Sequence, residues 1–293
     1  MRVLVAGATG AIGRPLTREL VNAGHEVLGL ARSQGSAVRV EETGGRPVRA
    51  DAMDRDGLLE AVKGLNADAV IHQMTALARP KRTLNADDPS TALRVTGTAN
   101  LLEAAAELGA RRFLTQSMVT GYGYRDHGDH VLTEDDPFAR CTGSVADHVI
   151  KGLMATEAQA LGAGGIALRY GVLYGPGTWF DASGRKARAL PVPTDGGGVM
   201  SWIHVEDAAT ATVAALERGG PSEAYNIVGD TPATWGHVAS VTAATRGRRP
   251  TRMPGRLLRL AVPYLGALMI DTTLRASNEK ATRELGWQRK HNV

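Results

Sequence analysis

The chain has 293 residues, which suffices for one or two domains with ample hydrophobic cores. Its 34 basic residues face 30 acidic ones, and the arginines are scattered, so we expect no nucleic-acid partner. No apolar run is long enough to cross a membrane, and the N-terminus lacks a signal-peptide cleavage site. The single cysteine, Cys141, excludes an intrachain disulfide, and we expect a soluble cytoplasmic protein.

Short apolar runs alternate with helix-spaced segments through residues 1–175. The expected strands are Arg2–Ala6, Glu26–Leu30, Arg46–Arg49, Ala69–His72, Arg112–Thr115 and Ile166–Tyr170. The expected helices run from Ile12 towards Gly24, over Ala92–Leu108 and over Asp147–Leu161. This alternation predicts an α/β fold with a doubly wound parallel Rossmann sheet. Residues 176–293 are irregular, and we expect a smaller substrate-binding part there, woven partly back into the first domain.

A glycine turn joins the first strand to the first helix with the spacing G-x-x-G-x-x-G. Glycine permits the tight turn, the approach of the backbone to a diphosphate, and close packing of helix on strand. The diphosphate then rests on amide groups at a helix N-terminus. The turn therefore predicts a dinucleotide site formed by Gly7, Ala8, Thr9, Gly10, Ala11, Ile12, Gly13 and Arg14.

The end of the second strand indicates which dinucleotide is preferred. NAD-preferring sites place an acidic residue there to hold the ribose 2′-hydroxyl, whereas this chain has Arg32 followed by Ser33. Arg32 can pair with a 2′-phosphate, and Arg14 can add a second positive charge. These residues favour NADP(H) over NAD(H); the alternative is that Arg32 is only a surface charge.

Further motifs occur in order along nearly the whole chain: Gly97-Thr-Ala-Asn-Leu-Leu-Glu-Ala-Ala, Leu168-Arg-Tyr-Gly-Val-Leu-Tyr-Gly-Pro-Gly and Trp202-Ile-His-Val-Glu-Asp-Ala-Ala. With the glycine turn, they resemble the extended and atypical branches of the short-chain dehydrogenase/reductase superfamily. The resemblance implies an oxidoreductase and adds cofactor-binding residues. These are Asp51, Ala52, His72, Gln73, Met74, Gln116 and Tyr170.

The catalytic pattern of that superfamily is broken in this chain. Most members use a Ser or Thr with Tyr-x-x-x-Lys, whose Tyr transfers the proton, but no tyrosine here has a lysine four residues later. Counting back from Glu157 puts Val149 and Leu153 at the two positions, while Asp147 and Lys151 have the same mutual spacing.

Ser117 follows the fifth expected strand, where the superfamily places its Ser or Thr. It can polarise a substrate carbonyl or merely cap a turn. Ser117, His148 and Lys151 are the candidate catalytic residues, alongside a bound water or an acidic hydroxyl on the substrate.

Aromatic and methionine side chains suggest a flat, hydrophobic substrate. The candidate pocket residues are Met118, Trp179, Phe180, Met200 and Trp202, although for each taken singly a core position is the favoured interpretation. Relatives that bind nucleotide sugars usually carry Asn where this chain has Val172, which weakens the interpretation that the substrate is a nucleotide sugar. The whole resembles actinomycete aromatic-polyketide ketoreductases, such as those acting on angucyclinones.

The sequence therefore favours an NADPH-dependent ketoreductase for a hydrophobic, polycyclic aromatic ketone of antibiotic biosynthesis. A redox sensor that binds NADP without turnover and a nucleotide-sugar epimerase or dehydratase are the alternatives. We expect no metal site: the segment Asp126–His130 is interpreted as a solvated loop, and His204 as a structural residue. The exact ketone and the oligomeric state stay open.

Overall fold

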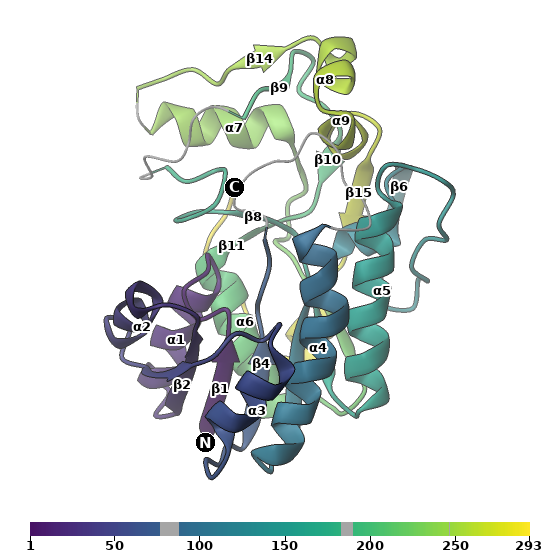
Figure 1. Ribbon diagram of the computed structural model, residues 1–293. Helices are drawn as coiled ribbons and strands as arrows, with labels where there is room; N and C mark the ends of the chain where they lie inside the picture. Colours follow the sequence, from purple (N-terminus) through teal and green to yellow (C-terminus); the bar gives the residue numbers. More distant parts are fainter. Residues whose placement is uncertain (77–87, 183–189, 246) are drawn as a thin grey trace.

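Seven parallel strands form the central sheet in the order β12-β7-β5-β4-β1-β2-β3 (Figure 1). The computed structural model describes residues 1–76, 88–182, 190–245 and 247–293. The strands are β1 (Arg2–Ala6), β2 (Glu26–Ala31), β3 (Arg46–Arg49), β4 (Ala69–His72), β5 (Arg112–Met118), β7 (Ile166–Tyr170) and β12 (Ala224–Ile227). The expected α/β fold with a doubly wound parallel sheet is confirmed.

Helices cover both faces of this sheet. The helices α1 (Gly13–Asn22), α6 (Val205–Arg218) and α10 (Glu279–Leu285) pack on one face. The helices α3 (Arg55–Val62), α4 (Pro89–Glu107) and α5 (Asp147–Gly162) pack on the other, and α2 (Gln34–Glu41) connects β2 to β3. Because successive strand residues point to opposite faces, Val3 and Val5 join the first layer whereas Leu4 and Ala6 join the second. Burial on both faces explains why these strands are continuous apolar runs.

The strand order reverses at β1, which pairs with β2 on one side and β4 on the other. In open α/β sheets, a crevice forms at the carboxyl ends of the strands on either side of such a reversal, and ligands bind there. The fold therefore directs attention to the segments that follow β1, β2 and β4.

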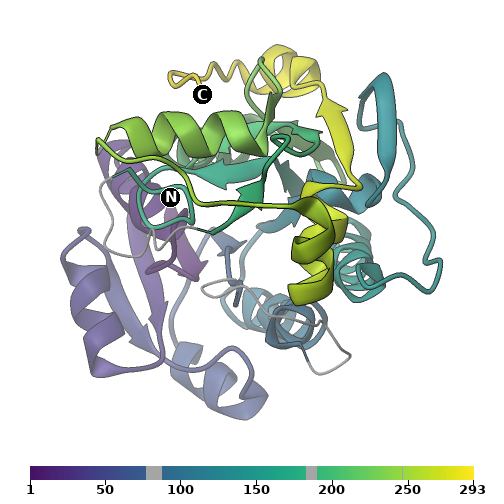
Figure 2. The same cartoon turned by 90° about the horizontal axis from the view of Figure 1, so that it is seen from above.

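The rest of the chain lies beyond the carboxyl ends of the strands, at the top of Figure 1; Figure 2 views it from above. Short strands pair there as β8 (Val172–Tyr174) with β11 (Trp202–His204), β9 (Val192–Pro193) with β14 (Arg252–Met253), β10 (Val199–Met200) with β13 (Ala233–Thr234), and β6 (Asp126–Leu132) with β15 (Thr273–Ala276). The helices α7 (Trp235–Ala244), α8 (Gly255–Ala261) and α9 (Pro263–Met269) complete this part, and a 3₁₀ helix, Val119–Tyr122, follows β5. A second hydrophobic core holds these elements together.

Two connections tie the C-terminal part to the sheet. Strand β12 comes from the last third of the chain, yet it adds to the sheet edge beside β7. Helices α6 and α10 likewise belong to the layer that packs on β1. None of the helices in the described ranges is long and apolar enough to cross a membrane.

The expected loop at Asp126–His130 is wrong, because these residues belong to strand β6. The strand pairs in parallel with β15, and most of its side chains are exposed. A strand exposed on both faces lacks the apolar alternation that would reveal it in a sequence.

Candidate active site

The glycine turn brings three backbone segments into contact at the carboxyl end of β1. A Cβ at Gly7 would lie 2.7 Å from the carbonyl of Gln73, and Gly7 has a φ of +91°. A Cβ at Gly13 would lie 2.0 Å from the Gly7 oxygen, so α1 can approach the turn only with glycine there. In contrast, a Cβ at Gly10 would meet only the Gly7 oxygen, at 3.2 Å. Gly7 and Gly13 thus serve packing, whereas Gly10 leaves an open face on the turn.

That open face has the chemistry of a diphosphate cradle. No side chain caps α1, whose N-cap residue is Ile12. In its first turn Pro15 has no amide hydrogen and the Arg14 amide donates to the Gly10 carbonyl, so the Gly13 amide is the one of these three that an anion can use. Ala11 lies in the same turn and faces the loop at Gly177, where a Cβ would lie 3.7 Å from the Ala11 Cα. The residues present fit a dinucleotide, with the turn holding its diphosphate.

Two arginines flank this cradle. Arg32 follows the last residue of β2 and is exposed, and Arg14 is exposed in the first turn of α1. Ser33 accepts a hydrogen bond from the amide of Ser36 and so caps α2, which fixes the backbone next to Arg32. Both guanidinium groups are therefore accessible from solvent near the carboxyl ends of β1 and β2.

Asp51 and Ala52 shape the segment after β3. The Asp51 carboxylate accepts from the amide of Met53, which forms a local turn. The Ala52 carbonyl accepts from the side-chain amide of Asn100 on α4. The asparagine of the Gly97–Ala105 motif therefore braces this segment against α4.

The residues after β4 are held by buried side chains. His72 is fully buried, with its Nδ1 accepting from the Met74 amide and its Nε2 donating to the Leu93 carbonyl. Burial lowers the pKa of His72 to about 4, so the ring stays neutral while it joins β4 to α4. The structure thus places the His72 ring in the interior, and not on an open surface.

Gln73 and Tyr170 connect β4 to β7. The Gln73 side-chain amide donates to the Tyr170 hydroxyl at 2.7 Å, and that hydroxyl lies 2.6 Å from the Thr212 Oγ1 of α6. Burial raises the pKa of Tyr170 to about 12, which keeps the phenol protonated. Gln116 donates to the Met74 carbonyl at 3.4 Å, so β5 also supports this segment.

On α5, the two positions that should carry the catalytic pair hold apolar residues. Thr115 bonds to Thr156 of α5 at 2.8 Å, and Ser117, two residues on, shares the Thr115 face of the strand. On α5, Leu153 and Val149 lie one and two turns before Thr156, and both are buried. Ser117 is fully buried, and its Oγ has no hydrogen-bond partner among the described residues. An orphaned hydroxyl here is available to a ligand.

Glu157 supports this alignment. Its carboxylate pairs with the Arg169 guanidinium of β7 at 2.8 Å, and both side chains are largely buried. The Arg169 guanidinium also donates to the Tyr122 hydroxyl and lies over the Phe138 ring. The ion pair fastens α5 to the sheet, and counting back from it gives Leu153 and Val149.

The other spacing, Asp147 with Lys151, does not form a pair that faces β5. The Asp147 carboxylate accepts from the Gly143 amide and the Ser144 hydroxyl, which closes the loop before α5. The Lys151 side chain is exposed, and His148 is half-buried. The His148 carbonyl accepts from the Thr91 hydroxyl, and this bond links α5 to α4.

Three of the five expected pocket residues lie in the core of the C-terminal part. Phe180, Met200 and Trp202 are nearly or fully buried, and Trp202 packs edge-on against Phe180 and Trp235. The Trp202 indole also donates to the Ala233 carbonyl. Met118, at the end of β5, and Trp179 stay half-exposed.

Sequence reasoning missed a buried arginine. Arg94 is 1% exposed, and its Nη2 lies 3.8 Å from the Met118 Sδ. Burial is the largest effect on Arg94 and lowers its pKa, while Tyr124, Tyr264 and Asp88 act in the opposite direction. The available signal was its spacing, because Arg94 shares a helix face with the buried residues Thr98 and Leu101.

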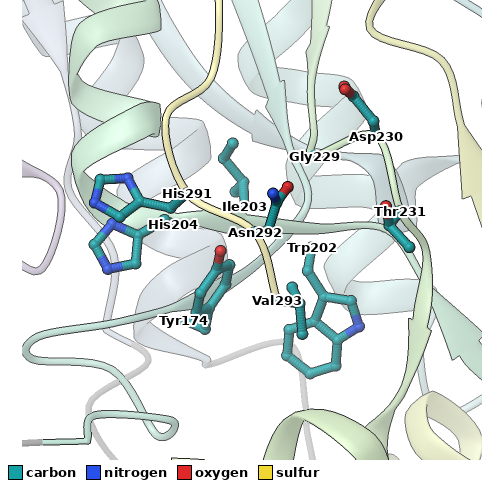
Figure 3. Close-up of a pocket in the computed structure, with 10 residues that line it drawn as sticks. All are labelled: Tyr174, Trp202, Ile203, His204, Gly229, Asp230, Thr231, His291, Asn292 and Val293. Atoms are coloured by element: carbon teal, nitrogen blue, oxygen red, sulfur yellow. The ribbon is translucent and has the colours of Figure 1, made fainter. Parts of the chain in front are cut away.

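The lining of a small pocket near the C-terminus includes neither Ser117 nor a residue of the glycine turn (Figure 3). It is lined by Tyr174, Trp202, Ile203, His204, Gly229, Asp230, Thr231, His291, Asn292 and Val293. The last residues of the chain form part of its wall. They are held by the buried Asp207, whose carboxylate accepts from the amides of Lys290 and His291.

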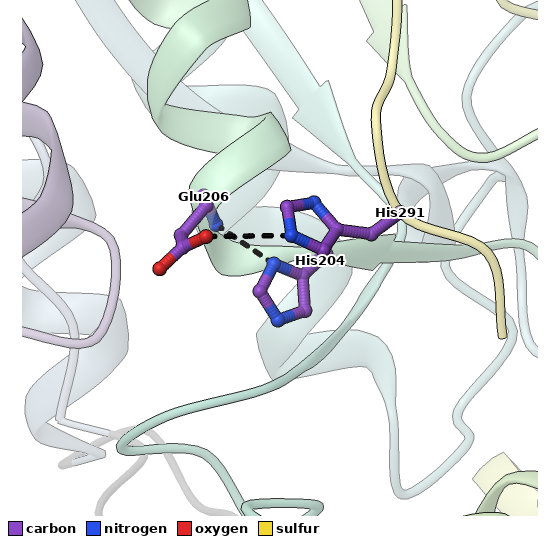
Figure 4. A group of neighbouring side chains, drawn as sticks. All are labelled: His204, Glu206 and His291. Atoms are coloured by element: carbon purple, nitrogen blue, oxygen red, sulfur yellow. Dashed lines mark hydrogen bonds and ion pairs between the residues drawn. The ribbon is translucent and has the colours of Figure 1, made fainter.

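His204, Glu206 and His291 form a cluster whose composition suits a metal ion (Figure 4). The imidazole rings are stacked, with centroids 3.9 Å apart, so their nitrogen lone pairs lie in nearly parallel planes and do not converge. The His204 Nδ1 accepts from the Glu206 amide and caps α6, while the His291 Nδ1 pairs with Asp207. This geometry serves the docking of the C-terminal tail.

The family model for the NAD dependent epimerase/dehydratase family matches residues 3–228. The chain belongs to this family. The resemblance to extended short-chain dehydrogenases is thus confirmed at family level, and the chain is an enzyme of the oxidoreductase or epimerase type.

Two reductases from Streptomyces species match this chain over nearly its whole length. A 3-diazoavenalumate denitrifying reductase from a Streptomyces species is 38% identical, over 99% of this chain and 97% of that protein. A dTDP-4-dehydro-6-deoxy-D-allose reductase, also from Streptomyces, is 28% identical, over 99% of this chain and 96% of its own length. Among solved structures, the dTDP-glucose 4,6-dehydratase DesIV from Streptomyces venezuelae, with NAD and TYD bound, covers this whole chain and 93% of its own. It superposes with a TM-score of 0.79 at 22% identity and shares the fold.

The open face at Gly10 generates a prediction about dinucleotide binding. Gly10→Ala should leave folding nearly intact, since the added methyl meets only one oxygen, but should weaken dinucleotide affinity at least about tenfold by keeping the diphosphate off the backbone. Titration of the purified variant with NAD(H) and NADP(H), beside thermal unfolding, measures both effects.

Gly162→Ala is the matched control, because Gly162 is exposed at the end of α5 and a Cβ there meets nothing within 4 Å. It should bind dinucleotide like the wild type. Unchanged affinity in Gly10→Ala would mean that the diphosphate does not rest on this turn.

Proposed function

We propose that this chain is an NADPH-dependent reductase of a flat aromatic substrate, and that the reducible group is an aryl diazo group in its diazonium form, which is lost as N2. The observation that carries this proposal is the apolar pair Val149 and Leu153 at the positions of the usual acid and its lysine, beside a Ser117 without a partner among the described residues. The full-length similarity to a denitrifying reductase supports it.

The chemistry explains why such a site needs no tyrosine. Reduction of a ketone leaves charge on an oxygen atom, which must then be protonated. When hydride replaces a diazonium group on an aromatic carbon, the new C–H bond takes the hydride electrons, and the pair of the broken C–N bond leaves with N2. No oxyanion forms and no proton is transferred. Val149 and Leu153 then contribute by excluding water, which would otherwise compete for the electrophile.

NADPH, when bound, supplies the hydride from its nicotinamide ring. In this chain, the Gly7–Gly13 turn would hold the diphosphate, and Arg32 with Arg14 would pair with the 2′-phosphate. The Ser117 Oγ would donate to an oxygen of the substrate and fix its orientation. Met118 and Trp179, the half-exposed members of the expected pocket, would contact the aromatic plane.

A second candidate is the reduction of a polycyclic aromatic ketone, as in antibiotic biosynthesis. Ser117 favours it, since a buried hydroxyl without a partner among the described residues can polarise a carbonyl. The proton would then have to come from water, from His148 or Lys151, or from a hydroxyl of the substrate itself. Epimerisation or dehydration of a nucleotide sugar is disfavoured, because it begins with oxidation of a hydroxyl and requires a base.

The test uses NADPH deuterated at C4 with a panel of aryl diazo compounds, aromatic ketones and nucleotide sugars. We expect deuterium at the aromatic carbon that carried the diazo group, with one N2 released per NADPH oxidised. Mass spectrometry and gas analysis measure the two products, and reactions without protein correct for spontaneous loss of N2.

The other outcomes separate the alternatives. Deuterium at the carbinol carbon of a ketone product, with the diazo compounds untouched, would contradict the proposal and indicate a ketoreductase. Turnover of a nucleotide sugar would restore the epimerase interpretation. NADPH binding without transfer to any compound would favour a redox sensor.

Cofactor preference is tested at Arg32. Arg32→Ala should weaken NADPH binding about 10- to 100-fold, through loss of charge-assisted hydrogen bonds to the 2′-phosphate, and should leave NADH binding within about twofold. Arg111→Ala is the control: this exposed arginine comes directly before β5, at the amino end of the parallel strands and so opposite to the carboxyl ends, and it carries the same charge. Equal losses for NADPH and NADH in Arg32→Ala would contradict the assignment.

A further inference from the structure

Arg94 is a charged residue in the interior of the α4–α5 layer. Its side chain is 1% exposed, and its stem passes over Gly152 of α5, where a Cβ would lie 3.2 Å from the Arg94 Cδ. The guanidinium reaches the end of β5, with Nη2 3.8 Å from the Met118 Sδ. Its Nε has no hydrogen-bond partner in the described part of the chain. The absence of a side chain at Gly152 therefore makes room for a guanidinium beside a half-exposed residue of the expected pocket.

Within the described ranges, this guanidinium lacks a matched counter-charge. Arginine stays protonated in proteins, so burial does not neutralise it, and a buried charge is costly unless it is paired. No carboxylate of the described residues forms an ion pair with it, whereas Arg169, another deeply buried arginine, pairs with Glu157. The Asp88 carboxylate, at the N-terminus of α4, opposes the effect of burial by raising the pKa of Arg94, and it accepts a hydrogen bond from the Ser90 amide. The site thus presents a positive charge and, at Nε, an N–H donor without a partner among the described residues.

Two phenols add a further donor. The hydroxyls of Tyr124 and Tyr264 lie 3.0 Å apart, and Tyr264 belongs to α9 of the C-terminal part. Burial raises the pKa of both, so each keeps its proton. One proton suffices for the bond between them. When Tyr264 donates in that bond, the Tyr124 proton can go to the Thr120 hydroxyl; when Tyr124 donates, the Tyr264 proton can go elsewhere. The guanidinium and the phenol hydroxyls are donors that suit an anion, and among the described groups Asp88 is the carboxylate that acts on Arg94.

We infer that Arg94, together with the Tyr124–Tyr264 pair, binds a carboxylate of the substrate. A guanidinium and a carboxylate match in shape and charge, and one singly charged group balances one arginine. The inference rests on the proposed function and narrows its substrate class to diazo-bearing aromatic carboxylates. The carboxylate end would lie at Arg94, and the reacting carbon would lie nearer Ser117.

The test measures the affinity of two proteins, the wild type and Arg94→Met, for each of two ligands. The ligands are an aromatic carboxylate and its carboxamide, both without a diazo group, titrated calorimetrically into the NADPH-loaded protein. The variant Arg94→Met keeps most of the stem and removes the charge. We expect the wild type to prefer the carboxylate about 10- to 100-fold, and Arg94→Met to bind the two ligands equally.

A structural role for Arg94 predicts a different pattern. Arg94→Met would then weaken both ligands alike, and the preference for the carboxylate would survive, which would overturn the inference. If Arg94→Met fails to fold, the affinities of the wild-type protein for the two ligands still test the inference. Equal affinity for the carboxylate and the carboxamide overturns it. Tyr264→Phe should reduce the preference only in part, since it removes one donor and keeps the charge.

Two further results keep this inference separate from the proposed function. If the carboxylate preference depends on Arg94 but no diazo compound is turned over, the proposed function fails and the anion site stands. If inorganic phosphate or a nucleoside diphosphate competes with the Arg94-dependent ligand and binds more tightly than the carboxylate, the carboxylate assignment is overturned.

Discussion

Gly7 and Gly13 allow the turn after β1, the start of α1 and the backbone at Gln73 to approach within distances that no side chain could occupy. The contact fixes where α1 begins, and it brings the segment after β4 against the turn. Gln73 then reaches Tyr170 on β7, so the same contact extends across the sheet. The shape of the turn is therefore a consequence of how β1, β4 and α1 pack, and Gly10 is the position in the turn where a Cβ would meet only one atom.

On α5, the contacts that hold the helix against the sheet are separate from the two positions at which the usual catalytic side chains are expected. The Glu157–Arg169 ion pair and the bond between Thr115 and Thr156 keep α5 in place on the sheet. On this helix, the proposed function uses Val149 and Leu153 as apolar surface in place of a proton donor. An electrophile that loses N2 needs only hydride and protection from water, which is what the proposal asks of this site. The arginine on the neighbouring helix supplies the charge that an apolar site lacks.

Much of the fold could be predicted because parallel strands buried on both faces are continuous apolar runs. β1, β3, β4 and β7 begin and end at the expected residues. β12 was not predicted as a strand of the sheet, because it joins the edge after a long irregular connection, and local sequence does not encode that pairing. β6 was missed because an exposed strand of polar residues resembles a loop.

The candidate site was predicted less completely. The turn at Gly7–Gly13 has a strong local signature because its glycines are required by backbone contacts. Whether Phe180, Met200 and Trp202 lie in the core or line a pocket depends on packing between elements that are distant in the sequence. The sequence alone therefore does not distinguish an aromatic residue of the core from one of a pocket. Arg94 was overlooked within an alanine-rich helix, although its helical spacing put a charge on the buried face.

The central claim is that hydride transfer in this site needs no proton from the protein. The most direct measurement compares the single-turnover rate of NADPH oxidation in H2O and D2O, at several pH values, with an aryl diazo substrate. The account predicts that the rate in H2O divided by the rate in D2O is about 1 and that the rate does not depend on pH, because no proton is transferred in the transition state. A ratio of about 2 or more, with a rate that follows the titration of one group, would contradict it and require a general acid in the site.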